Sequence, residues 1–216
     1  MLEIKGIAKA FGTLRVLAGV SMRVEQGERV ALRGATGSGK TTFLRLIAGL
    51  EEPDAGEIWA GGARLSAPGK LVPPHRRGVA MVFQSPCLWP HMTVAENVGF
   101  AITDTNRASR RDVLRRVLET WGVGELAGRY PDQLSTGQAR KVAVARAMAK
   151  RPRILLMDEA LVNLDVQTQE ELLPLIDTAA SEIGCSMMYV THAPAEADRL
   201  GCRSLWLRNG RLDACP

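Results

Sequence analysis

A glycine-rich loop between a predicted strand and a predicted helix is the feature that most constrains this chain. Residues 34–41 match the pattern G-x-x-x-x-G-K-[ST]. A short apolar run, Arg29–Leu32, precedes the loop, and a helical pattern over Thr42–Leu50 follows it. In this context the glycines let backbone N–H groups converge on phosphate oxygens, and the positive end of the helix dipole points at the same place. The loop therefore predicts an α/β fold with phosphate contacts from Gly34, Ala35, Thr36, Gly37, Ser38, Gly39, Lys40, Thr41 and Thr42.

Two polar groups of this loop and two later carboxylates predict the chemistry. We expect Lys40 to reach the β- and γ-phosphates and the Thr41 hydroxyl to bind Mg²⁺. The apolar strand Ile154–Met157 ends at Asp158 and Glu159. Because parallel sheets place ligands at the carboxyl ends of their strands, Asp158 should meet the loop and hold Mg²⁺. Glu159 is then placed to polarise an attacking water.

A third polar segment, Leu134–Gln138, opens a predicted helix. Its Ser135 and Gln138 satisfy the capping-box pattern, in which the two side chains cap a helix start reciprocally. Taken alone, a structural cap is the better interpretation. A capped helix start with Gly137 nearby is also a candidate anion site, and the two interpretations are compatible.

The remaining pattern predicts an antiparallel opening and an inserted helical segment. We expect strands over residues 2–8, 16–24, 29–32, 57–60, 78–83, 154–157 and 186–190, and a last hairpin over 204–211. Helices are expected over 93–100, 109–121, 135–149 and 167–183, the last kinked or restarted at Pro174. Residues 67–78, rich in Pro, Arg and Lys, are predicted to be an exposed loop.

Composition excludes several classes of protein. The four cysteines are far apart and show no C-x-x-C pair, which argues against a zinc site or a disulfide framework and favours a reducing cytoplasm. No run of about 18 apolar residues predicts a membrane span, and the N-terminus does not read as a secretion signal. The formal charge of +5 includes an arginine-rich helix, but no nucleic-acid motif accompanies it, so we expect no nucleic-acid partner.

Taken together, these motifs resemble the nucleotide-binding subunit of ATP-binding cassette (ABC) transporters over essentially the whole chain. Residues 34–41 are similar to the Walker A loop, 134–138 to the signature motif and 154–159 to Walker B. Gln84 matches the Q-loop, Asp165 the D-loop and His192 the H-loop. Phe11 sits where the family has an aromatic residue that stacks on adenine.

The resemblance implies a P-loop NTPase (RecA-like) parallel-sheet core with an N-terminal antiparallel β subdomain and an inserted α-helical subdomain. The core would comprise residues 1–84 and 151–216, and the helical subdomain 85–150. It also implies ATP and Mg²⁺ as cofactors. Two subunits would bind head to tail as a homodimer or a heterodimer, so that each ATP lies between the Walker motifs of one and Ser135, Gly137 and Gln138 of the other.

The resemblance assigns roles to single residues as well. Glu159 would be the catalytic base, with Lys40 and His192 at the γ-phosphate. Gln84 would link Mg²⁺ or water to the membrane subunit, and Asp165 would bridge the two nucleotide-binding subunits. Two departures stand out: Thr136 replaces the usual Gly, adding a β-branched side chain near a phosphate, and Ala160 replaces the usual Pro. We expect the first to weaken the contact between subunits and the second to cause a geometric adjustment.

Within the family, residues 74–77 and 88–98 are most similar to prokaryotic importers, which work with a permease and an extracytoplasmic binding protein. The segment after Gln84, with Cys87, Leu88, Trp89 and Met92, would form a groove for the permease or pack within the helical subdomain. The subunit would then lie in the cytoplasm, peripheral to the inner face of the membrane. Because the sequence ends soon after residue 211, we expect no C-terminal regulatory domain of the kind that some relatives carry. An exporter ATPase and a soluble non-transport ABC ATPase remain the alternatives.

Overall fold

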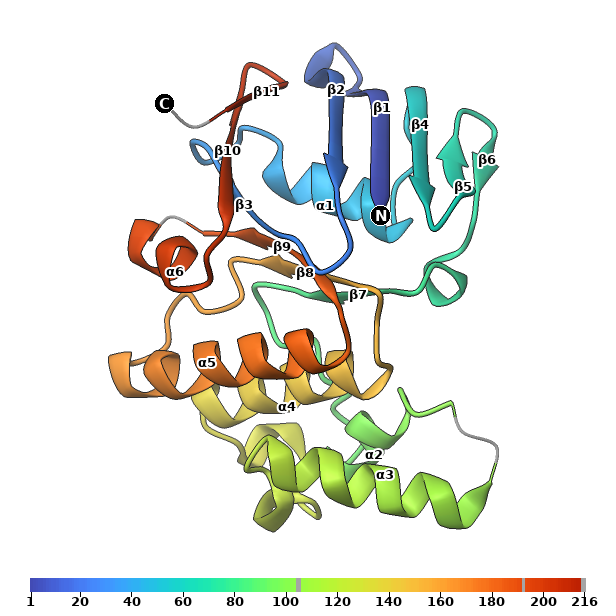
Figure 1. Ribbon diagram of the computed structural model, residues 1–216. Helices are drawn as coiled ribbons and strands as arrows, with labels where there is room; N and C mark the ends of the chain where they lie inside the picture. The colour runs from blue at the N-terminus through green and yellow to red at the C-terminus, as the bar shows by residue number, and fades with distance from the viewer. Residues whose placement is uncertain (104–105, 192, 215–216) are drawn as a thin grey trace.

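The computed structural model describes residues 1–103, 106–191 and 193–214, which form two sheets with helices around them (Figure 1). The first sheet is antiparallel and has the order β2-β1-β4-β5-β6. Its first two strands confirm the predicted antiparallel opening. The strands are β1 (Leu2–Phe11), β2 (Leu14–Val24), β4 (Ala55–Ala60), β5 (Ala63–Ala67) and β6 (Lys70–Leu71).

The second sheet has the order β11-β10-β3-β9-β8-β7. All neighbouring strands in it run parallel except β11, which pairs antiparallel with β10. Because β3, β9 and β8 are neighbours and run parallel, their carboxyl ends lie at the same edge of the sheet. The strands are β3 (Arg29–Arg33), β7 (Val79–Val82), β8 (Ile154–Asp158), β9 (Ser186–Val190), β10 (Arg203–Arg208) and β11 (Arg211–Ala214).

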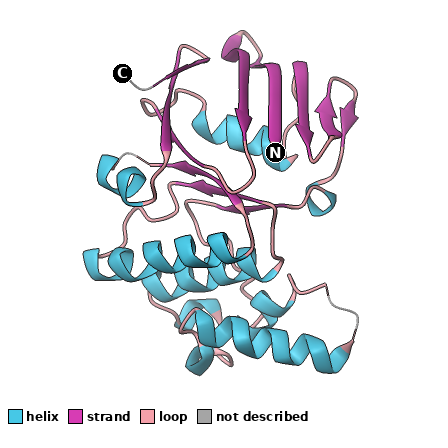
Figure 2. Ribbon diagram, in the orientation of Figure 1, coloured by secondary structure: helices cyan, strands magenta, loops and turns pink. Residues whose placement is uncertain are grey.

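The helices cover both faces of the parallel sheet (Figure 2). Helix α1 lies between the two sheets, while α4 and α5 cover the opposite face, with α2 and α3 beyond them (Figure 1). The helices are α1 (Lys40–Ala48), α2 (Val94–Gly99), α3 (Arg107–Thr120), α4 (Thr136–Ala149), α5 (Val166–Glu182) and α6 (Pro194–Arg199). Three 3₁₀ turns, Pro74–Arg76, Gly124–Leu126 and Pro131–Gln133, complete the set.

Alternation along β8 explains this layering. Leu155 and Met157 belong to a buried cluster with the helical side, whereas Ile154 and Leu156 belong to a second cluster with α1 and the antiparallel sheet. Successive side chains of a strand point to opposite faces, so an entirely apolar strand needs cover on both. The continuous hydrophobic run of β8 is the sequence signature of that position.

Residues 67–78 match the predicted exposed loop in part, since residues 68–71, 73, 75 and 76 are exposed, and differ from it in two respects. They contain β6 and a 3₁₀ turn, and Arg77 is only 4% exposed. The Arg77 guanidinium donates to the carbonyls of Val72, Leu46, Ile47 and Leu65 and to Ser66 Oγ at 2.6–3.2 Å. A buried charge is tolerated here because all its donors are satisfied, and it caps the negative end of α1. Burial lowers the pKa of Arg77 to about 10.

Other expectations met mixed outcomes. Helix α5 continues through Pro174, so the predicted restart is wrong, and α6 was not expected. Between β7 and β8, the described residues form helices and turns and no strand. The exact division of the chain at residues 85 and 150 stays a prediction. None of the helices in the described part of the chain combines the length and apolar character needed to span a bilayer.

Candidate functional site

The phosphate loop joins β3 to α1 and depends on its glycines. Gly34, Gly37 and Gly39 have φ values of 151°, 77° and 102°, in the left-handed region that side chains disfavour. A Cβ on Gly34 would lie 2.5 Å from the Leu207 carbonyl oxygen, and one on Gly39 would lie 2.8 Å from Val16 Cγ1. The loop is therefore pressed against β10 and β2, and only glycine fits at its two ends.

Lys40, the first residue of α1, is folded back into this loop. Its ammonium donates to the carbonyl oxygens of Gly34 at 2.9 Å and Ala35 at 3.0 Å, and its side chain is buried. Burial lowers the pKa of Lys40, and the charges of Glu159 and Asp158 oppose that shift. The structure thus holds a cation inside the loop, near Asp158 at the end of β8 and Glu159 directly after it.

Thr41 and Asp158 meet as predicted. Thr41 Oγ1 donates to Asp158 Oδ1 at 3.2 Å, which joins the start of α1 to the carboxyl end of β8. Asp158 is buried, and burial raises its pKa, helped by the Glu159 charge and opposed by the Thr41 hydrogen bond. A hydroxyl and a carboxylate are hard oxygen donors of the kind that bind Mg²⁺ together with substrate phosphates, so the pair fits this ion.

Glu159 follows at once and turns the chain away from the sheet. Its φ is 49°, an unusual conformation for a residue with a side chain, and its N–H donates to the Val190 carbonyl at 3.1 Å. That bond ties the end of β8 to the end of β9. His192, the predicted H-loop residue two positions further, lies outside the described residues.

The signature segment forms a second, separate cavity of about 320 Å³. Ser135 caps α4 by accepting from Gln138 N at 3.2 Å, and Gln138 Oε1 accepts from Ser135 N at 3.0 Å, which confirms the capping box. Thr168 and Asp165 of the next helix line the same cavity. None of the residues lining this cavity comes from the phosphate loop, so the structure does not unite the two groups of predicted contacts in one cavity.

Thr168 connects the parts of this second cavity. Its hydroxyl donates to Asp165 Oδ2 at 2.7 Å, and its N–H donates to Asp165 Oδ1 at 2.8 Å, which makes Asp165 the cap of α5. A Cβ on Gly137 would lie 3.2 Å from the Thr168 side chain. Gly137 is therefore packed against the residue that orients Asp165.

The two remaining predicted residues lie on the surface. Gln84 is exposed just after β7, and its carbonyl accepts from Arg140 Nη2, while Arg140 Nη1 donates to the Phe83 carbonyl at 2.5 Å. Phe11 ends β1 and is 48% exposed, with Lys9 Nζ 5.4 Å from its ring centroid. Both positions leave the side chains accessible to a ligand or partner.

Arginines of α4 hold the segment after Gln84, and the sequence interpretation missed them. Besides Arg140, Arg146 donates to the carbonyls of Cys87 at 2.8 Å and Pro86 at 3.1 Å. Burial lowers the pKa values of both arginines. The sequence signal that could have revealed them is a pair of arginines in a helix otherwise rich in Ala and Val. A charged side chain is unexpected on such a helix unless backbone carbonyls of another segment accept its hydrogen bonds.

Known proteins match both the sequence and the fold. The pattern of the family described as "ABC transporter" matches residues 17–162. A spermidine/putrescine import ATP-binding protein of Chromobacterium violaceum is 40% identical over 99% of this chain and 58% of its own length. A trehalose/maltose import ATP-binding protein of Thermococcus litoralis is 40% identical over 94% of this chain and 56% of its own length. The chain thus spans about three fifths of the length of such relatives.

A solved structure agrees over the whole chain. It is an ATP-binding cassette described as a dimer in a post-hydrolysis state, bound to ADP and Pi. It is 30% identical, has a TM-score of 0.86, and the match covers 99% of this chain and 98% of that one. With the phosphate loop, the Asp158 junction and the capped signature helix in place, the chain belongs to the ABC transporter family and has the fold of its ATP-binding cassettes.

Proposed function

We propose that this chain is the ATP-hydrolysing subunit of an ABC transporter and that it couples dimer closure to transport through a separate permease. The observation that carries the proposal is the Thr41–Asp158 hydrogen bond, because it brings the end of the phosphate loop to the acidic end of β8. Lys40, in the same loop, supplies a cation for the transferring phosphoryl group.

The residues suggest a division of labour in hydrolysis. The backbone N–H groups of residues 34–41 and the Lys40 ammonium would bind the phosphates and stabilise charge in the transition state. Thr41 and Asp158 would hold Mg²⁺, which would supply positive charge to stabilise the transferring phosphoryl group. Glu159 would accept a proton from water and orient it in line. His192 and Gln84 would complete the γ-phosphate side, and Phe11 would stack on adenine.

A second copy would complete each ATP site. The signature cavity and the phosphate loop are separate in one chain, and the cassette of similar fold is described as a dimer. Bound head to tail, one copy would offer Ser135, Gly137 and Gln138 to the ATP held by the other. Asp165, at the same cavity, would then lie at the boundary between the subunits.

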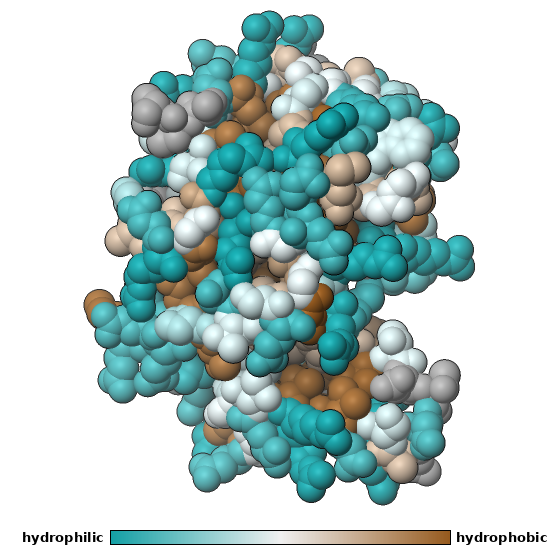
Figure 3. All heavy atoms as spheres, viewed as in Figure 1, coloured by the Kyte–Doolittle hydropathy of each residue, from teal (hydrophilic) through white to brown (hydrophobic). Residues whose placement is uncertain are grey.

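A groove beside α2 fits a permease segment. A cavity of about 600 Å³ is lined by Met92, Phe100 and Leu114, with Arg110, Arg111 and Glu96 among its polar residues. Figure 3 shows hydrophobic side chains gathered in a hollow over α2. Of the apolar residues after Gln84, Met92 lines this groove. Leu88 packs instead against the buried core, and the ring centroid of Trp89 lies 4.6 Å from that of Phe100.

The direction of transport proposed is import. The two relatives named above are import ATP-binding proteins, one for spermidine/putrescine and one for trehalose/maltose. This spread favours import without favouring one cargo. The subunit would then work at the inner face of the membrane, on a permease that receives its cargo from an extracytoplasmic binding protein.

Trapping the closed dimer tests the proposal. Glu159→Gln keeps the size of the side chain but cannot accept the proton, so it should bind Mg·ATP, fail to hydrolyse it and accumulate as a dimer. Light scattering with ATP measures the mass, and a phosphate-release assay measures turnover. Glu170→Gln, an exposed change on α5, is the matched control and should hydrolyse ATP as the wild type does. A monomer that holds ATP alone, or unchanged turnover in Glu159→Gln, would overturn the proposal.

A further inference from the structure

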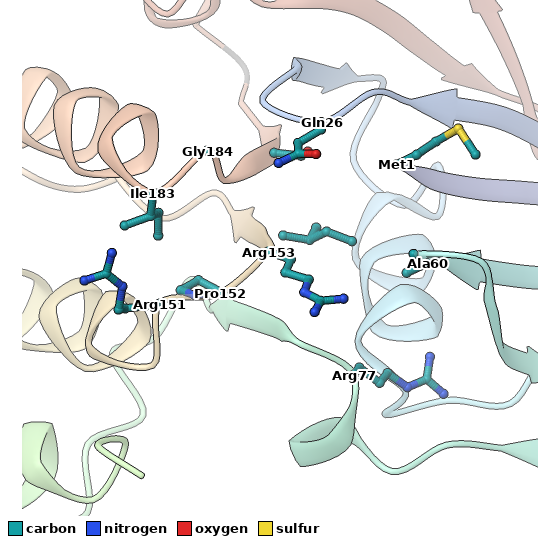
Figure 4. A pocket seen from close by; sticks show the side chains of 12 residues that line it. Met1, Gln26, Ala60, Arg77, Arg151, Pro152, Arg153, Ile183 and Gly184 are labelled. Atoms are coloured by element: carbon teal, nitrogen blue, oxygen red, sulfur yellow. The ribbon is translucent and has the colours of Figure 1, made fainter. Parts of the chain in front are cut away.

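A cavity of about 440 Å³ lies at the edge of the parallel sheet opposite the phosphate loop (Figure 4). Its walls include Ile154, the first residue of β8, and Ser186, the first residue of β9, whereas the phosphate loop follows the last residue of β3. Ala60, the last residue of β4, lines it from the antiparallel sheet, together with Met1 just before β1 and Gly61 just after β4. The cavity therefore spans both sheets, and a ligand there could be bound at the same time as ATP.

The cavity is lined by positive charge alone. Arg77, Arg151 and Arg153 line it, and its walls include no Asp or Glu. Within the described ranges, none of these three arginines forms an ion pair. Some exposed arginines elsewhere on this chain do form ion pairs, as Arg64 does with Glu57 and Arg203 with Glu28.

Two of the arginines are available to a ligand. All five N–H donors of Arg77 are committed to carbonyls and Ser66, so Arg77 contributes charge but no donor. The residues Arg151 and Arg153 are exposed. Figure 4 shows their guanidinium groups on opposite sides of Pro152, and Arg153 Nη1 lies 3.2 Å from the point that a Gly61 Cβ would occupy. Two separated cations suit a ligand with more than one negative group.

We propose that this cavity is a binding site for a small multivalent anion, held by Arg151 and Arg153 with Gln26 as a neutral donor. Guanidinium groups bind phosphate and carboxylate through paired, charge-assisted hydrogen bonds. The volume suits a small molecule, since ligand pockets hold roughly 300–1,000 Å³. The ligand would be an anion that bears phosphate groups or several carboxylates. Either kind of anion could bind here without occupying the ATP site.

Calorimetric titration of the Lys40→Ala protein with pyrophosphate, and separately with citrate, tests the site. The Lys40 change weakens phosphate binding at the loop, so that the distal cavity dominates the signal. We expect saturable binding of at least one probe. Binding of pyrophosphate alone would assign a phosphate ligand, binding of citrate alone a polycarboxylate, and binding of both a site that selects by charge.

Matched variants locate the binding. Introducing Arg151→Ser and Arg153→Ser into the Lys40→Ala protein should weaken its affinity for the bound probe at least about tenfold, because charge-assisted hydrogen bonds to the anion are lost. Arg115→Ser with Arg116→Ser removes the same charge from exposed positions on α3 and should leave affinity within about twofold. Gln26→Glu, which retains both arginines, should also weaken binding by placing a carboxylate in the wall. Absence of binding by both probes, or an equal loss in the α3 control, would overturn the proposal.

Discussion

The hydroxyl of Thr41 donates a hydrogen bond to the carboxylate of Asp158 across 3.2 Å, although the two residues are 117 positions apart in the chain. The contact joins the first turn of α1 to the last residue of β8. Strand β9 lies between β3 and β8, so this bond crosses the end of the intervening strand. The bond thereby brings together, at one edge of the sheet, the residues proposed to bind phosphate and Mg²⁺.

Lys40→Ala should weaken nucleotide binding strongly. The lysine is the buried cation of the loop, and its removal takes away the charge that we propose binds the phosphates. The expected loss in affinity is at least about tenfold, the cost of one charge-assisted hydrogen bond. Equilibrium titration with a fluorescent ATP analogue measures it. Lys150→Ala, at the far end of α4, is the control, and equal affinity in Lys40→Ala and wild type would contradict the assigned role.

Asp158→Asn should stabilise the nucleotide-free protein while it abolishes hydrolysis. Burial raises the pKa of Asp158 above its ordinary value, so the folded state binds a proton more tightly than the unfolded state. Stability from this residue is therefore greatest below pH 3.8 and falls as pH rises through the raised pKa. At neutral pH the buried charge is a cost that Asn lacks.

Thermal unfolding checks this prediction. We expect Asp158→Asn to raise Tm at pH 7 by roughly 2–4 °C, which corresponds to about 1 kcal/mol for a chain of this size. The difference from wild type should shrink as the pH is lowered. A lower Tm in the variant at pH 7 would show that the carboxylate stabilises the fold.

Thr168→Val should raise the pKa of Asp165. Backbone and side-chain hydrogen bonds from Thr168 lower that pKa, and valine removes only the side-chain donor. The carboxylate's contribution to stability, present above its unfolded pKa and lost as pH falls through the folded one, should then disappear at a higher pH. Carboxyl NMR titration measures the shift. Thr168→Ser retains the hydroxyl and should titrate as wild type, and an unshifted Thr168→Val would contradict the role given to this bond.

The described cysteines should react in a fixed order. Cys87 is exposed, whereas burial raises the pKa of both Cys185 and Cys202 to about 11. Since the thiolate is the nucleophile, iodoacetamide at pH 8 should modify Cys87 well before the other two. Peptide mass spectrometry over a time course follows the order. Early labelling of Cys185 in folded protein would contradict the burial of β9.

The sequence predicted the central strands and the phosphate loop well because their patterns are local. β8 is a continuous apolar run that ends in acids, and Ser135 with Gln138 shows the capping box directly. By contrast, nothing local reveals that Arg140 reaches the carbonyl of Phe83, 57 positions away. Long-range hydrogen bonds from arginine to the backbone depend on which segments pack together, and the hydrophobic periodicity of a sequence does not predict that.

The errors have physical reasons of the same kind. The segment 67–78 is largely exposed, as its polar residues suggest, yet Arg77 is buried because it finds backbone acceptors in two other segments, α1 and β5. Pro174 should interrupt a helix, but its cost is one missing hydrogen bond and a local clash, which the packing of Leu172, Leu173 and Ile176 in the core can offset. Helix α6 has six residues, too few for a periodic pattern.

Arg77 also decides which parts of the molecule can move independently. Its guanidinium fills the space beside Gly49, where a Cβ would lie 2.2 Å from Nε, and ties the end of α1 to β5. These hydrogen bonds hold the antiparallel sheet and α1, the helix that follows the phosphate loop, in a fixed arrangement. We therefore expect a conformational change between open and closed forms to move the α4–α5 side of the molecule. This side carries the signature segment, which is expected to contact the nucleotide bound by the partner subunit.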